Sequence, residues 1–175
     1  MRKKQKENSL NIPTELNLSY LFTEGMNIYT YFPKEKTHLF FSDEVALYEG
    51  KVVGERPWER PAKEIPQLIQ SWKKIELQID KKDRSKDKEQ LNNLMLEGIM
   101  ILFKLLFWSN EQPVNFQKWQ KRLAHFSIKP VNLIERIEFI LMRPFSYHAF
   151  RQLKGIVDEQ HKHFAREEAI KKASN

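Results

Sequence analysis

The second half of the chain repeats apolar side chains with the period of an α-helix. Between residues 66 and 79 they recur at the spacing i, i+3, i+4 and i+7, at Leu68, Ile69, Trp72, Ile75 and Ile79. This spacing places them on one face of a helix. Pro66 stands at the first turn, where proline is tolerated because the N–H that it lacks would have no partner there. The pattern therefore predicts an amphipathic helix that begins at Pro66.

The next apolar segment, LNNLMLEGIMILFKLLFW at 91–108, is hydrophobic on nearly every face of a helix. Such a helix is buried in a protein core or spans a membrane. Glu97 and Lys104 interrupt the segment, and Asn92 and Asn93 open it. A bilayer span needs about 20 mostly apolar residues with few charges. We therefore expect a central buried helix and no integral membrane association.

Three shorter patterns follow toward the C-terminus. Residues 113–125 favour a short amphipathic helix. Asn132, with Glu135 three residues later, resembles a capping box and predicts a helix that ends at Arg143, because the residue before a proline avoids the helical region. A last helix is expected to start at Pro144, and its apolar stripe contains Tyr147, Phe150, Leu153, Ile156, Val157 and Phe164. Residues 166–175 are expected to fray.

The first 65 residues carry no comparable period. Residues 1–10 are charged and polar, which predicts a disordered tail. Residues 11–65 are rich in aromatic side chains and are interrupted by glycine and proline, which predicts an irregular segment with short helical turns at 15–22 and 43–48. Phe40, Phe41 and Trp58 are the expected anchors of this segment. The alternating charges of residues 80–90 predict a solvated connection between the first two long helices.

Together these patterns predict an all-α fold. We expect a single compact helical domain of about five main helices at 66–170, with an irregular, aromatic-rich N-terminal segment at 11–65 packed on it. No repeat or second composition regime marks a further domain, so the chain is expected to form one globular unit. The 175 residues are enough to bury a core without metals or disulfides.

Composition adds limits on the chemistry. The chain has no cysteine, which excludes disulfide frameworks, thiolate metal sites and cysteine nucleophiles and is compatible with a reducing compartment. The basic start lacks the apolar stretch of a secretory signal, so we expect a cytoplasmic protein. The net charge is +7, and residues 111–175 carry 12 Lys and Arg against 7 Asp and Glu. Such an excess attracts nucleic acid, acidic proteins or anionic membranes.

The basic residues of the C-terminal half are the first candidate site. On the predicted helices, basic side chains neutralise phosphates or engage an acidic protein partner. The residues chosen for this role are Lys118, Lys121, Arg122, Lys129, Arg143 and Arg151, with Arg136 and Lys154 as additional members. No recognition-helix signature accompanies them, and glutamates are interleaved with them. Solvated helix faces are the default interpretation of these residues.

The corner between the last two predicted helices is the second candidate site. Glu135, Arg143, Tyr147 and His148 lie near it, and the unpaired amides of a helix start would help to bind an anion. This constellation would serve a small-anion-binding protein or an enzyme. The structural interpretation is favoured, because Glu135 has a capping role and Tyr147 fits the core stripe. No residue is assigned a catalytic role.

Cofactor chemistry has weak support in the sequence. The glycines do not cluster as a phosphate-binding loop requires, and no Lys-Ser or Lys-Thr follows Gly54. The run DEQHKH at 158–163 pairs Asp158 with His161 and Glu159 with His163 at helical spacing, but a di-metal bundle needs further carboxylates on facing helices. We therefore expect no cofactor and no metal site.

Several stretches resemble a known family. They are Trp72, LLFWSNEQPV at 105–114, KPVNLIERIEFILMRP at 129–144 and SYHAFRQL at 146–153, and PWERP around Trp58 is consistent with them. Residues 57–164 thus resemble the YpoC-like family of uncharacterised proteins from Bacillus-type bacteria, with most of the specificity in the pattern PVN-x-x-ER-x-x-FI-x-x-RP. The resemblance implies a small cytoplasmic protein, encoded near replication-initiation and DNA-repair genes, and transfers no site residues.

The leading hypothesis from the sequence is a non-enzymatic binding or adaptor protein. Its partner would be a protein or a nucleic acid bound by the basic C-terminal helices, with an association with DNA replication or repair. The alternative is an enzyme or small-anion-binding protein that uses Glu135, Arg143 and His148. Neither the partner nor the oligomeric state follows from the sequence.

Overall fold

The computed structural model describes residues 10–51 and 54–175, and this part of the chain is all-helical, with no strand. Its eight α-helices are α1 (Ile28–Tyr31), α2 (Lys34–Phe40), α3 (Ser42–Tyr48), α4 (Pro61–Lys81), α5 (Lys88–Ser109), α6 (Trp119–Ala124), α7 (Leu133–Met142) and α8 (Tyr147–Ala173). Three 3-10 turns are η1 (Thr14–Leu16), η2 (Leu18–Tyr20) and η3 (Pro57–Glu59). The expected tail at 1–10 lies outside the described residues except for Leu10.

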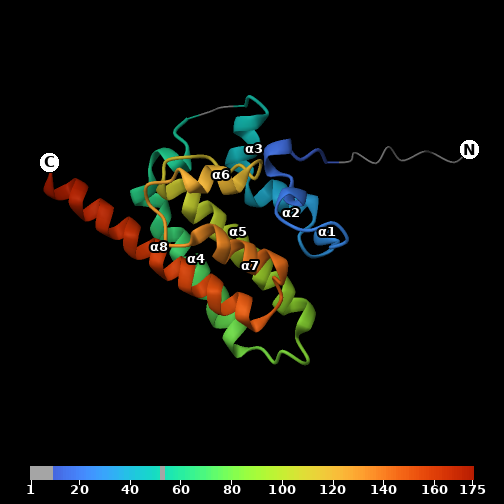
Figure 1. Cartoon of the computed structure of the whole chain (residues 1–175). Coiled ribbons are helices and arrows are strands. Elements are labelled where there is room, and N and C mark those ends of the chain that lie inside the picture. Colours follow the sequence, from blue (N-terminus) through green and yellow to red (C-terminus); the bar gives the residue numbers. More distant parts are fainter. Residues whose placement is uncertain (1–9, 52–53) are drawn as a thin grey trace, which may run out of the picture.

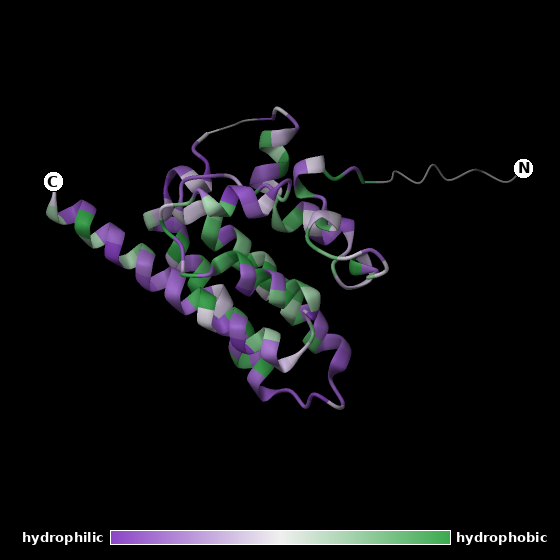
Figure 2. Cartoon of the chain, viewed as in Figure 1, coloured by the Kyte–Doolittle hydropathy of each residue, from purple (hydrophilic) through white to green (hydrophobic). Residues whose placement is uncertain are grey.

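Helix α5 is the centre of the fold (Figure 1). It packs against α4 and α8, and α7 lies along α8. Its buried residues include Leu96, Phe103 and Leu105, and Figure 2 shows its hydrophobic ribbon enclosed by helices with polar outer faces. By length and composition alone α5 meets the criteria for a membrane span, but 78% of its most apolar window is buried inside the protein. The prediction of a central buried helix is confirmed.

The start of α4 differs from the prediction. The helix begins at Pro61 rather than at Pro66, which lies inside it. Pro61 occupies the first helical turn, where its missing N–H has no effect. Pro66 removes one backbone hydrogen bond, and its exposed position leaves the freed carbonyl of Ala62 near solvent. The predicted connection at 80–90 is confirmed in its centre, since α4 ends at Lys81 and α5 begins at Lys88.

The helix caps near α7 also correct the prediction. Asn132 precedes α7 but has a left-handed φ of 53° and makes no side-chain cap, so the expected capping box with Glu135 is wrong. Helix α7 ends just before Arg143, as predicted. The start of α8 is set by Ser146 rather than by Pro144, because the Ser146 hydroxyl accepts a 3.0 Å hydrogen bond from the Ala149 N–H.

Two further expectations about α8 are wrong. Tyr147 does not join the core stripe; its side chain is 49% exposed, and the Arg84 guanidinium lies over its ring. Residues 166–175 do not fray, since α8 continues to Ala173. Lys171 near its end forms ion pairs with Glu111 and Glu168, which hold the last turns together. Figure 1 shows this end of α8 projecting beyond the other helices.

The N-terminal segment contains more helix than its sequence indicates. The expected helical turns at 15–22 and 43–48 are confirmed as η1, η2 and α3, while α1 and α2 had no visible period because each has at most seven residues. Phe41 and Trp58 are buried, as expected of anchors, and Phe40 is half-buried. The segment 113–125 contains a shorter helix than predicted, since only α6 at Trp119–Ala124 is helical.

Gly98 marks the closest approach of α5 to its neighbours. A Cβ atom at this position would lie 2.8 Å from Cζ3 of Trp72 and 3.1 Å from Cδ2 of Leu153. Trp72 is 1% exposed and Leu153 is fully buried, so neither side chain has room to move. Only glycine lets α4, α5 and α8 meet at this distance.

We therefore expect Gly98→Ala to lower the free energy of unfolding by about 1–2 kcal/mol, because overpacking a closed core outweighs the better helix propensity of alanine. Gly155→Ala is the matched control, since its Cβ would meet only Nη2 at the tip of the Arg136 side chain, at 3.2 Å, and no core side chain. It should stay within about 1 kcal/mol of the wild type. Urea unfolding followed by circular dichroism measures both, and equal stability of the two variants would contradict the predicted close packing.

Candidate functional site

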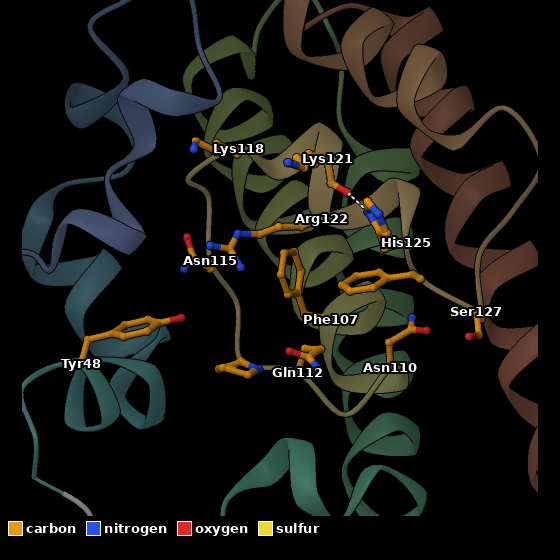
Figure 3. Close-up of a pocket in the computed structure, with 12 residues that line it drawn as sticks. Tyr48, Phe107, Asn110, Gln112, Asn115, Lys118, Lys121, Arg122, His125 and Ser127 are labelled. Carbon is orange, nitrogen blue, oxygen red and sulfur yellow. Dashed lines mark hydrogen bonds between the residues drawn. The ribbon is translucent and has the colours of Figure 1, made fainter.

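A cavity of about 770 Å³ opens between α3, the C-terminal end of α5 and α6 (Figure 3). It is larger than two other cavities, of about 320 and 390 Å³. Its lining combines aromatic, amide and basic side chains, which are Tyr48, Phe107, Asn110, Gln112, Pro113, Asn115, Lys118, Lys121, Arg122, His125, Phe126 and Ser127. Three of the basic residues chosen from the sequence, Lys118, Lys121 and Arg122, therefore share one cavity.

The loop between α5 and α6 forms one wall of this cavity, and Asn110 at its start ties the end of α5 to the segment after α6. The Asn110 side chain donates to the carbonyl oxygens of Leu106 at 2.8 Å and Ile128 at 2.9 Å, and it accepts from the Ile128 N–H at 2.9 Å. Glu111 and Lys118, near the two ends of the loop, have φ values of 56° and 50°. This left-handed conformation is uncommon for residues other than glycine and is often held at functional sites.

Below the loop, a buried carboxylate joins three parts of the chain. Glu44 of α3 is fully buried, and its Oε1 accepts hydrogen bonds from the Trp108 indole at 2.8 Å and from the Val114 N–H at 3.4 Å. The Tyr48 hydroxyl, one turn further along α3, donates to the Val114 carbonyl at 2.7 Å. Both backbone polar groups of Val114, its N–H and its carbonyl, are thus bound to α3.

The charge of Glu44 is only partly compensated. Burial raises the pKa of the Glu44 carboxyl from 4.5 to about 6, and the nearby Lys104 ammonium and the Trp108 hydrogen bond oppose this rise. Burial likewise lowers the pKa of Lys104, against the attraction of Glu44. Burial and the Glu44 charge raise the pKa of the Tyr48 hydroxyl, which keeps it a neutral hydrogen-bond donor. The second oxygen of Glu44, Oε2, has no hydrogen-bond partner among the described residues.

The rim of the cavity is basic. Lys118, Lys121 and Arg122 are exposed, and none of them forms an ion pair with an acidic side chain within the described part of the chain. Arg122 donates through Nε to the Gln117 carbonyl at 2.8 Å, which directs its guanidinium toward Asn115, as Figure 3 shows. His125 Nδ1 lies 2.7 Å from the Lys121 carbonyl, so its other ring nitrogen is free to face a ligand.

The remaining basic candidates lie elsewhere. Lys129 donates to the Ala124 carbonyl at the end of α6 and is half-buried. Arg143, after α7, and Arg151, on α8, are exposed and do not line the cavity. Of the additional members, Arg136 is held by both oxygens of Glu159, at 2.9 and 3.0 Å, and Lys154 is paired with Glu76. These two cations are compensated within the protein.

The helix corner does not gather its four candidates around one cavity. Tyr147 lines the cavity of about 390 Å³ together with Arg84, Lys88 and Phe145, and neither Glu135, Arg143 nor His148 contributes to it. All three of these residues are exposed. Phe145, at the same corner, packs against Tyr31 of α1 with ring centroids 5.1 Å apart. The contacts at the corner are those of a fold element.

The candidate metal ligands are separated by other contacts. Glu159, paired in the sequence with His163, binds Arg136 instead. That guanidinium lowers the pKa of the Glu159 carboxyl. In residues 10–51 and 54–175 no three His, Asp or Glu side chains are grouped to hold a metal ion.

Sequence reasoning missed most of the residues that line the cavity. Tyr48 and Glu44 are distant in the chain from α6, and Phe107 is indistinguishable from the other core residues of α5. The segment SNEQP at 109–113 contributes Asn110, Gln112 and Pro113 to the lining, and no pattern marked these residues as part of a site. The left-handed conformations of Glu111 and Lys118 leave no sequence signal, because neither residue is a glycine.

The resemblance to a known family is confirmed by comparison with known proteins. The model of the YpoC-like protein family matches residues 62–172. The chain is also similar to the uncharacterized protein YpoC of Bacillus subtilis (strain 168), with 36% identity over 118 residues, which are 67% of this chain and 72% of the relative. No solved structure matches the chain.

The buried carboxyl gives the site a specific pH dependence. Because its pKa is raised from 4.5 to about 6, the folded state binds more protons than the unfolded state between these values, and stability falls as pH rises through the window. We expect the free energy of unfolding of the wild type, relative to Glu44→Gln, to fall by about 2 kcal/mol from pH 4 to pH 7. Urea unfolding at both pH values measures it. A difference that stays constant or grows with pH would contradict the assignment.

Proposed function

The chain belongs to the YpoC-like family, and from the geometry of its cavity we propose that it is a non-enzymatic protein that binds nucleic acid. The similar Bacillus subtilis protein is itself uncharacterized. The surface that carries this role consists of Lys118, Lys121 and Arg122, and is called the basic rim below. Its partner is a phosphate backbone, and association with replicating or repaired DNA in the cytoplasm is the setting that the resemblance implies.

One observation carries the proposal. The cations of the basic rim have no acidic partner within the described residues, whereas Arg136 and Lys154 are paired with Glu159 and Glu76. An unpaired cation remains available to replace the counterions of a phosphate backbone, and this exchange dominates nucleic-acid affinity. The rim also borders aromatic rings, the second element of surfaces that bind nucleic-acid strands.

The enzyme alternative at the helix corner has less support. An acid–base site needs its groups within hydrogen-bond reach of one substrate atom. Glu135, Arg143 and His148 are exposed and share no cavity among the three described above. The corner is therefore not proposed as a second function.

Neutralising the rim tests the proposal. The triple variant Lys118→Gln, Lys121→Gln and Arg122→Gln should weaken binding to a fluorescein-labelled oligonucleotide by at least about tenfold at low salt. It should also make the slope of log K against log salt shallower by about 2, since each lost contact with a single strand contributes about 0.7. Fluorescence anisotropy across a salt series gives both quantities.

A second triple variant on α4, Lys73→Gln, Lys74→Gln and Lys81→Gln, is the control because it removes the same charge from exposed positions away from the cavity. At the 0.1 M point of the salt series it should reduce affinity by no more than about twofold, since charges are screened beyond about 10 Å at that salt concentration. Equal losses in the two variants would show a response to net charge alone. An undiminished affinity in the rim variant, or no binding by the wild type at low salt, would overturn the function.

A further inference from the structure

The cavity behind the basic rim has the form of a receptor for an unpaired nucleobase. We propose that the protein recognises single-stranded nucleic acid, with one base inserted into the cavity against Phe126 and the adjoining phosphates on the basic rim. This inference rests on the proposed function and deepens it, because it names the form of nucleic acid that the site accepts and the residue that accepts it.

The shape of the site favours a single strand. The cations lie on α6 and on the residue just before it, and a helix of 6 residues is only about 9 Å long. A helix that reads a duplex enters the major groove, whereas α6 lies beside a recess of about 770 Å³. A duplex keeps its bases stacked inside and would contact only the rim. An unpaired base is free to turn into the recess.

The apolar wall supplies a surface for stacking. Phe126 is half-buried, so part of its ring faces the cavity. Phe107 supports it from the core, with ring centroids 5.0 Å apart and the ring planes at 90°. Phe107 itself is only 2% exposed, and its position is therefore fixed by packing. A ring held in this way loses little freedom when a base stacks on it, and stacking is available to every base.

The polar groups of the cavity are arranged on two sides. In Figure 3 the basic rim lies on the α6 side of Phe107, and Gln112 and Asn110 lie on the opposite side. Asn110 is fully engaged by Leu106 and Ile128 and has little capacity left for a ligand. Gln112 is exposed; its backbone N–H donates to the Phe107 carbonyl at 3.0 Å, while its side-chain amide has no hydrogen-bond partner within the described residues. An amide both donates and accepts, so we expect a weak preference among bases rather than strict sequence recognition.

The first test changes the ligand and leaves the protein intact. The wild type is titrated with a labelled single-stranded DNA, with an abasic strand of equal length and charge, with a duplex of the same length and with the corresponding RNA strand. The abasic strand and the duplex should each bind at least about fivefold more weakly than the DNA strand at equal salt, since a stacked base is absent or hidden. The RNA strand shows whether the site distinguishes the sugar.

The second test changes the ring. Phe126→Leu keeps an apolar side chain but removes the aromatic face, and should weaken binding of the DNA strand about fivefold or more while leaving the abasic strand unaffected. Phe139→Leu on α7 is the control, since Phe139 is 48% exposed and does not line the cavity. It should bind both strands as the wild type does.

The outcomes separate this inference from the proposed function. If the abasic strand and the duplex bind as tightly as the DNA strand, and the basic rim variant still weakens all of them, the protein binds phosphate alone and the base receptor is wrong. If the wild type binds none of the strands at low salt, both proposals fail. Because the abasic comparison uses wild-type protein, it decides the matter even if Phe126→Leu does not fold.

Discussion

The hydrogen bonds of the Glu44 carboxylate are the interaction on which the arrangement of the molecule depends. One oxygen accepts from Trp108 of the central helix and from the peptide of Val114 in the cavity wall, while Glu44 itself belongs to α3. Burying a carboxylate is unfavourable unless hydrogen bonds and a countercharge offset the loss of water. Here the offset is incomplete, as the raised pKa shows. The same group therefore fixes the position of the N-terminal segment and limits the stability of the fold near neutral pH.

The charges that interrupt the apolar helix have a related role. Glu97 forms an ion pair with Lys36 of α2 at 3.3 Å, and Lys104 donates to the Phe40 carbonyl at the end of the same helix. The Lys104 ammonium also lies over the rings of Phe40 and Trp108, at 4.3 and 4.9 Å from their centroids. Glu97 and Lys104 thus lie on the face of α5 that contacts α2. In the sequence they argued only against a membrane span, because their partners lie more than 60 positions away.

The difference between local sequence patterns and contacts of distant residues explains how much of the fold followed from the sequence. Helices α4, α7 and α8 are long enough to show a period, α5 shows a continuous apolar run, and most of the residues that these patterns selected are buried. Tyr147 satisfied the period of α8 but is 49% exposed, and its ring contacts the Arg84 guanidinium of the loop after α4 rather than the core. Asn132 satisfied the pattern of a cap, but its backbone is left-handed instead of extended as in a typical capping residue, and its side chain makes no cap. Local patterns thus identified the elements, while contacts between distant segments decided which residues they bury.

For the site, the sequence selected Lys118, Lys121 and Arg122, and the structure places all three on one cavity. The sequence could not exclude Arg136 and Lys154, because their acidic partners lie on other helices. The wall of the cavity could not be predicted from the sequence, because it depends on hydrogen bonds from α3 to both the N–H and the carbonyl of Val114. The family match at 62–172 contains the basic rim, Phe107 and Phe126, but neither Glu44 nor Tyr48. A property general to the family must therefore be sought first in the rim and its aromatic wall, and α3 supplies the support that holds them in place in this chain.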